Sequence, residues 1–182
     1  MKKFLLALFF IGSVGFAKPY TIDFTHSSVG FEVKHLGLSK VSGDFGTFTG
    51  NIDIDPQTKK INKFEGEVDI SSISTKNKKR DEHLTSNDFF DSKKFNKGYF
   101  VMTKHEGNKI YGDLTFKGIK KPVVFDVEVS GPAISPLNKK EVMALDIQGV
   151  ILRKDFDIGT GIGDMIVSNE SKVSIQLEIY EK

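Results

Sequence analysis

The sequence contains no cysteine, which excludes disulfide bonds, thiolate metal sites, a cysteine nucleophile and a lipidated N-terminal cysteine. It also contains no tryptophan and only two arginines, so nearly all of its basic residues are lysines. Its longest apolar run, residues 4–16, is shorter than the roughly 20 residues that a membrane-spanning helix needs. We therefore expect no permanent membrane anchor, and a fold whose stability comes from a core.

The first 17 residues have the three parts of a secretory signal peptide. Lys2 and Lys3 precede the apolar run, the small residues Gly15 and Ala17 precede the expected cleavage site, and a Lys-Pro pair follows it. We expect a signal peptide over residues 1–17 and a single domain over residues 18–182, located in the periplasm or secreted.

Removal of that segment changes the charge balance. The full chain has a formal net charge of +2, but without Lys2 and Lys3 it has 24 basic and 24 acidic residues. A neutral chain lacks the uniform positive field that attracts nucleic acids, so we expect no nucleic-acid partner.

Apolar and polar residues alternate along most of the remaining chain, with the period of two that is typical of half-buried strands. Short turn-rich connections favour antiparallel strands over a parallel sheet covered by helices. About eight such strands in one domain predict an all-β fold, an eight-stranded antiparallel barrel wide enough for one ligand. The clearest alternating runs are residues 29–34, 51–55, 64–70, 110–116, 123–129 and 173–179.

One polar stretch, residues 76–97, breaks this period. Its cap-type residues predict a helical excursion around residues 78–95, which we expect to contain two short helices. Asp81, His83 and Ser86 are the residue types of a hydrolytic triad, but three polar types within six residues of a polar segment are common, and helix capping and ion pairing explain them more simply. A lipid-processing enzyme that uses these three residues is therefore the alternative function.

Metal and cofactor sites are not expected. The four histidines are spread along the chain with no pair at metal-ligand spacing. The glycine-rich segment 159–164 resembles a phosphate loop only superficially, because a strand pattern follows it where a helix N-terminus would be needed. We interpret that segment as a flexible loop.

Phenylalanine and arginine are the most informative side chains. Twelve phenylalanines fall in residues 18–182, and they either fill a core or line a tunnel for a long apolar ligand. Arg153 follows a run of inward-facing apolar positions at a strand end, so its guanidinium needs a buried partner. That partner is either a ligand head group at the barrel mouth or a salt bridge with Asp81 or Asp155.

Several sequence blocks resemble the YceI-like family. Between Tyr20 and roughly Ile179 they occur in the order that the family shows: residues 20–27, 29–37, 41–45, 80–84, 89–91, 112–123 and 151–156. The resemblance implies an extended eight-stranded, lipocalin-like barrel whose apolar cavity holds a polyisoprenoid or another long-chain amphiphile, in a protein that is usually exported and often dimeric. This chain has Asp157 where the family pattern reads glycine.

Together these observations predict an exported carrier of a long-chain amphiphilic lipid, either a polyisoprenoid, an isoprenoid quinone-like molecule or a fatty-acid derivative, that functions as a homodimer. A barrel with a filled interior that acts through its surface is a third possibility. For the polar head of the lipid we expect contacts from Arg80, Asp81, His83 and Arg153. For the apolar tail we expect contacts from Phe31, Phe45, Phe48, Phe89, Phe90, Phe116, Phe125, Ile147 and Ile151.

Overall fold

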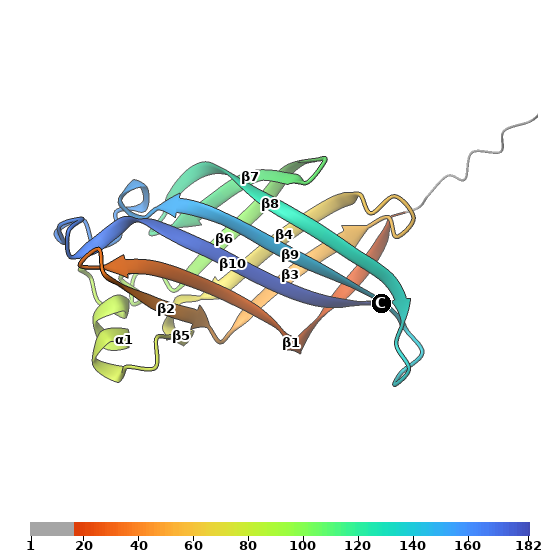
Figure 1. The fold of residues 1–182 in the computed structure, drawn as a ribbon, viewed down its shortest axis with the longest axis horizontal. Coiled ribbons are helices and arrows are strands. Elements are labelled where there is room, and N and C mark those ends of the chain that lie inside the picture. Colours follow the sequence, from red (N-terminus) through yellow and green to blue (C-terminus); the bar gives the residue numbers. More distant parts are fainter. Residues whose placement is uncertain (1–16) are drawn as a thin grey trace, which may run out of the picture.

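A computed structural model describes residues 17–182 of the chain, and the expected signal peptide lies, apart from Ala17, outside the described residues. The described part is an elongated antiparallel barrel with one short α-helix at one end (Figure 1). Its strands are β1 Lys18–His35, β2 Ser39–Phe45, β3 Phe48–Ile54, β4 Ile61–Asp69, β5 Ile73–Ser74, β6 Lys97–Glu106, β7 Lys109–Phe116, β8 Ile119–Ile134, β9 Glu141–Leu152 and β10 Val167–Glu181.

The sheet closes because the last strand pairs with the first. Neighbouring strands follow the order β10-β9-β8-β7-β6-β4-β3-β1, and β10 pairs with β1 along most of its length. Strands β2 and β3 are two halves of one bent strand, as are β4 and β5, with β2 pairing with β5 and β3 with β4. The predicted eight-stranded antiparallel barrel is therefore confirmed.

A wide bulge in β1 keeps one face of this long strand apolar. The pairing with β10 is interrupted between Asp23 and Ser28, where β1 has extra residues relative to its partner. Because successive strand residues point to opposite faces, the bulge changes which positions face inward. Tyr20 and Ile22 face the interior before it, and Val29 and Phe31 face the interior after it.

The helical excursion contains one α-helix instead of two. Helix α1 spans Lys78–Thr85. Asn77 caps its N-terminus, where its side chain accepts a hydrogen bond from the Arg80 N–H. The expected second helix is a series of turns, because Asp91 has a positive φ of 51° and its N–H bonds back to the Ser86 carbonyl at 2.8 Å. Among residues 17–182 no helix has both the length and the apolarity needed to cross a membrane.

The interior is packed at one end of the barrel. Tyr20, Ile54, Ile61, Ile110, Met143 and Ile179 fill it there and are at most 1% exposed. The Tyr20 hydroxyl donates to Glu141 at 2.6 Å, which satisfies the one polar atom that this residue places near the core. A second apolar cluster, which contains Phe45, Phe89, Phe116 and Phe156, lies toward the end that carries α1.

Candidate functional site

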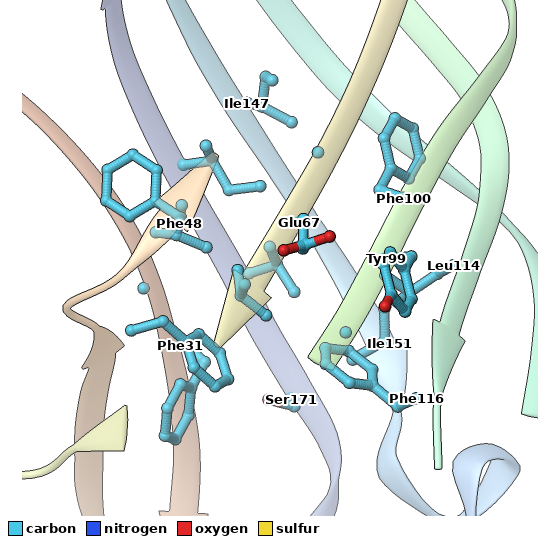
Figure 2. Close-up of a pocket in the computed structure, with 18 of the residues that line it drawn as sticks. Phe31, Phe48, Glu67, Tyr99, Phe100, Leu114, Phe116, Ile147, Ile151 and Ser171 are labelled. Atoms are coloured by element: carbon cyan, nitrogen blue, oxygen red, sulfur yellow. The ribbon is translucent and has the colours of Figure 1, made fainter. Parts of the chain in front are cut away.

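A cavity extends from the middle of the barrel toward the end that carries α1. It has a volume of about 160 Å³, measured as room for the centre of a water molecule, and its surface is almost entirely apolar (Figure 2). All nine residues that we expected at the apolar tail line this cavity. The structure thus places them together, while their contact with a ligand stays a prediction.

The middle of the barrel is hollow and not filled. Several inward-facing side chains there retain partial exposure although they belong to the core clusters, in contrast to the packed end. These side chains therefore border empty space inside the barrel. These partly exposed residues are Val29, Val68, Phe100, Ile151, Val173 and Ile175.

Phenylalanine rings leave this space open because each of several rings lies over a glycine of a neighbouring strand. A Cβ atom added at Gly98 would lie 2.1 Å from the Phe116 ring, and one added at Gly149 would lie 2.2 Å from the Phe125 ring. Gly43 under Phe31 and Gly112 under Phe100 repeat the arrangement, each at 2.5 Å. The glycines let the rings sit back against the barrel wall, so that bulky residues line the cavity without blocking it.

The sequence interpretation missed part of the lining. Most of the missed apolar residues lie on strands and share the inward parity, which is the signal that could have identified them. Leu84 on α1 and Ile158 in the loop after β9 have no such parity. Four polar lining residues, Thr49, Glu67, Tyr99 and Ser171, carried no such signal. The missed apolar residues include Ile22, Val29, Val33, Phe64, Val68, Leu84, Phe100, Leu114, Ile158, Val167, Val173, Ile175 and Leu177.

Arg153 is buried and its guanidinium is fully used by the protein. Nε donates to the Ser168 carbonyl, and the two terminal nitrogens donate to five further oxygens. Burial lowers the pKa of Arg153, and the nearby Asp164 carboxylate, 3.3 Å away, opposes that shift. The guanidinium binds loop carbonyls and Asp164, so the expected partners Asp81 and Asp155 are wrong. Arg153 also lines the cavity, and its expected contact with a lipid head stays a prediction. Those five oxygens are the carbonyls of Ile158, Gly159, Ile162 and Val167 and a carboxylate oxygen of Asp164.

These bonds hold the glycine-rich segment that we interpreted as a flexible loop. Asp157, two residues before this segment, has a φ of 55°, a conformation that favours glycine but that aspartate tolerates better than most residues. Lys117 donates to the Asp157 carbonyl at 2.6 Å, and Thr160 donates to its carboxylate at 3.0 Å. The Lys117 ammonium, at 3.2 Å from that carboxylate, also lowers the pKa of Asp157. The aspartate at a family glycine position thus keeps the turn.

Arg80 and Asp81 lie outside the cavity lining and connect helix α1 to β5. The Arg80 guanidinium donates to the Thr75 hydroxyl at 2.7 Å and to its carbonyl at 2.9 Å. Asp81 accepts from the Thr75 N–H at 2.8 Å and from its hydroxyl at 2.5 Å. The geometry does not support their expected contact with a lipid head, because these groups orient the segment that precedes the helix.

The triad residues do not form a proton relay. The Ser86 hydroxyl donates to the His83 backbone carbonyl at 2.7 Å and not to the His83 ring. The His83 ring instead packs against Phe89 and lies 3.4 Å from an exposed Asp88 carboxylate. His83 is also absent from the cavity lining, so neither its expected head-group role nor the enzymatic alternative has support in the geometry.

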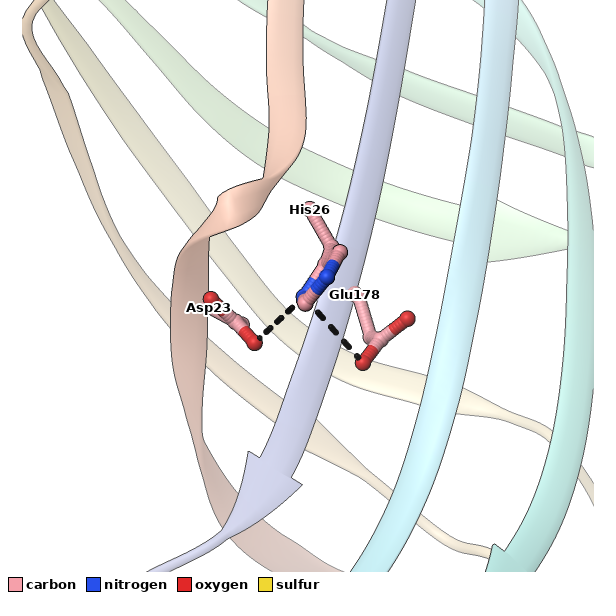
Figure 3. Close-up of side chains that lie close together, drawn as sticks. All are labelled: Asp23, His26 and Glu178. Atoms are coloured by element: carbon pink, nitrogen blue, oxygen red, sulfur yellow. Dashed lines mark hydrogen bonds and ion pairs between the residues drawn. The ribbon is translucent and has the colours of Figure 1, made fainter. Parts of the chain in front are cut away.

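A polar cluster that the sequence did not predict lies at the β1 bulge (Figure 3). The His26 Nδ1 atom is 2.9 Å from an Asp23 carboxylate oxygen and 3.9 Å from one of Glu178. Asp23 also accepts from the Thr25 N–H, and the Glu178 N–H donates to the Ser27 hydroxyl at 3.0 Å. The cluster therefore satisfies backbone groups that the bulge removes from the strand ladder, and we assign it no metal.

The His26–Asp23 contact makes this polar cluster sensitive to pH. Asp23 raises the pKa of His26 above its ordinary 6.5, and His26 in turn lowers the pKa of Asp23. The stabilisation from the pair is lost as the pH rises through the raised pKa of His26, and as it falls through the lowered pKa of Asp23.

We expect an NMR titration of the His26 ring protons to give a midpoint above 6.5, because the Asp23 carboxylate favours the imidazolium. In Asp23→Asn the midpoint should move back toward 6.5. An unchanged midpoint in that variant would show that Asp23 does not interact with the ring in solution.

Comparison with known proteins places these features in context. The sequence profile of the YceI-like domain matches residues 20–179. A UPF0312 protein of Staphylococcus aureus strain MSSA476 is 39% identical over 139 residues, which cover 76% of this chain and 81% of that protein. The crystal structure of the Campylobacter jejuni YceI protein is similar, with a TM-score of 0.77, 32% identity, and coverage of 100% of this chain and 99% of the other.

A polyisoprenoid-binding domain from Saccharophagus degradans has a TM-score of 0.68 and 13% identity, and the match covers 90% of this chain and 98% of that domain. At that identity the likeness shows a shared fold. The barrel fold is therefore shared with both of these solved structures.

Proposed function

Because this chain belongs to the YceI-like domain family, we propose that it binds the long apolar chain of an amphiphilic lipid in its barrel cavity. The observation that carries the proposal is a hollow region with an almost entirely apolar lining in the middle of a closed barrel. A polyisoprenoid is the ligand class that we favour, since a neighbour of the same fold is a polyisoprenoid-binding domain.

The expected affinity comes from the tail. Burial of one methylene group contributes about 0.8 kcal/mol, so a chain of isoprenoid length can bind tightly with few polar contacts. Arg153 lines the cavity but its donors are all used within the protein, and Arg80, Asp81 and His83 do not line the cavity. We therefore propose that the protein selects ligands by the length and shape of the tail much more than by the head group.

Export is part of the proposal. The signal-type pattern in residues 1–17 motivates it, and a periplasmic or secreted carrier would transfer lipid outside the cytoplasm. We also keep the homodimer as a proposal, motivated by the family resemblance alone.

The direct test is extraction of lipid from native protein purified from its own cells, followed by mass spectrometry. We expect a stoichiometric long-chain lipid to co-purify. A ligand-free barrel that also fails to bind prenyl alcohols and fatty acids added from solution would contradict the proposal.

The glycines beneath the rings give a specific test of the cavity. In Gly98→Ala the new methyl group collides with the Phe116 ring, which must swing into the cavity. We expect tail binding to weaken about tenfold or more, and the free energy of unfolding to fall by about 1 to 3 kcal/mol, the usual cost of overpacking. Fluorescent fatty-acid titration and urea unfolding measure the two effects.

Gly66→Ala is the matched control, because Gly66 also lines the cavity but an added Cβ there meets the Phe64 ring only at 3.8 Å. It should bind lipid nearly as the original chain does. The double variant Gly98→Ala/Phe116→Leu should recover binding, since the smaller side chain makes room. Equal loss in both single variants would show that the added methyl group acts without displacing a ring.

A further inference from the structure

One end of the barrel carries an exposed apolar rim, formed by Leu36 and Leu38 in the β1–β2 turn and by Met165 and Ile166 before β10. Their exposed fractions are 52%, 91%, 83% and 48%, although all four side chains are large and hydrophobic. The two segments are joined, because the Leu36 N–H donates to the Ile166 carbonyl at 3.0 Å. Figure 1 shows both at the end of the barrel that carries α1.

The rim continues the wall of the cavity. Val33 lines the cavity three residues before Leu36, and Val167 lines it directly after Ile166. Val167 and His35 are also register partners in the β1–β10 ladder, so the two lining segments reach the end of the barrel side by side. A ligand tail that leaves the cavity at this end therefore passes over the rim.

Exposed lysines accompany the rim although the chain as a whole has almost no net charge. Lys34 precedes Leu36 by two residues, and Lys76, Lys78 and Lys79 lie at the start of α1, at the same end of the barrel. The ion pairs within residues 17–182 include none of these four lysines. Their charge is therefore available to an external anion.

We propose that the rim docks on the surface of a lipid bilayer that contains anionic lipids, where the cavity exchanges its ligand with the membrane. This inference rests on the proposed function and names the partner at which loading occurs. Apolar side chains on turn tips can enter the boundary between headgroups and acyl chains, while lysines beside them attract anionic headgroups. Four side chains are too few for a stable protein interface, which buries roughly 800 Å² on each partner.

The test is co-sedimentation with vesicles of phosphatidylglycerol and phosphatidylethanolamine, compared with vesicles of phosphatidylcholine alone. The unmodified chain should bind the anionic vesicles more strongly, and added salt should weaken that binding. Leu38→Ser/Met165→Ser should bind about tenfold more weakly or worse, because two nearly fully exposed apolar side chains no longer enter the bilayer. Lys78→Gln/Lys79→Gln should lose the preference for anionic vesicles.

Leu137→Ser is the matched control, since Leu137 is 90% exposed in the turn between β8 and β9, at the opposite end of the barrel. It should bind vesicles as the unmodified chain does. The proposal is overturned if the rim variant binds vesicles normally or if Leu137→Ser weakens binding equally. It is also overturned if sedimentation velocity shows that the rim variant only dissociates a dimer, because a second copy would then be the occupant.

A fluorescent fatty acid added from solution separates this proposal from the proposed function. If the rim variant takes up the fatty acid normally but has lost vesicle binding, both hold. If the unmodified chain takes up the fatty acid but ignores vesicles, the docking proposal fails and the lipid-binding function stands. If it binds vesicles through the rim but takes up no lipid, the function fails and the docking surface stands.

Discussion

Arg153→Met is expected to lower the free energy of unfolding by about 3 to 5 kcal/mol, the usual cost of breaking a buried charged network on one side. Methionine keeps much of the side-chain volume but donates no hydrogen bond, so the carbonyls of Ile158, Gly159 and Ile162 lose a buried partner. Urea unfolding of the lipid-free protein measures the loss.

Two further variants separate the loop carbonyls from the charge. Arg153→Lys keeps the charge but cannot reach acceptors on both sides of the loop, so it should recover only part of the loss. Asp164→Asn removes the single ion-pair partner, whose side chain is 54% exposed, and should cost less than about 1 kcal/mol. Full stability in Arg153→Met, together with loss of binding for anionic amphiphiles only, would support the head-group interpretation instead.

Phe156→Ala is expected to cost about 3 to 5 kcal/mol, because Phe156 is 1% exposed, does not line the cavity, and is buried within the second apolar cluster. Phe116→Ala should cost clearly less in lipid-free protein, although its ring centroid lies only 5.8 Å from that of Phe156. One side of the Phe116 ring faces the cavity and packs against no protein atoms, so removing the ring loses fewer packing contacts.

The difference in unfolding free energy between these two variants tests whether the cavity is empty in the lipid-free protein. Lipid binding should respond in the opposite order, with Phe116→Ala changing affinity more than Phe156→Ala once both proteins are folded. Equal unfolding costs for the two variants would show that the cavity is filled by side chains in solution.

The strands, and the cavity-lining residues that lie on them, could be predicted from the sequence because pleating fixes which residues face inward. Once a run such as residues 123–129 is identified as a strand, the inward position of Phe125 follows from parity. The bulge between Asp23 and Ser28 is harder to see, because the parity of β1 differs on its two sides and each side looks regular alone.

The interactions of the residues that we expected at the lipid head could not be predicted in the same way. The partners of Arg153 are mainly backbone carbonyls of the following loop, and every residue carries a carbonyl, so no side-chain pattern marks them. The same limit applies to Arg80 and Asp81, which bind Thr75 through the turn before α1. The role of the glycines under the rings could not be predicted either. A glycine at an inward position of a strand only indicates a less stable strand until the ring that packs over it is known.

The packed end of the barrel fixes the direction in which a ligand could lie in the cavity. Tyr20, Ile54 and Met143 leave no passage there, so a chain cannot be threaded through the barrel from end to end. If the cavity holds a lipid tail as we propose, the tail should enter from the side of α1 and stop where the packing begins, with its head group behind it. A tail longer than the hollow section must then double back or stay partly outside, so the depth of the hollow acts as a ruler that sorts chains by length.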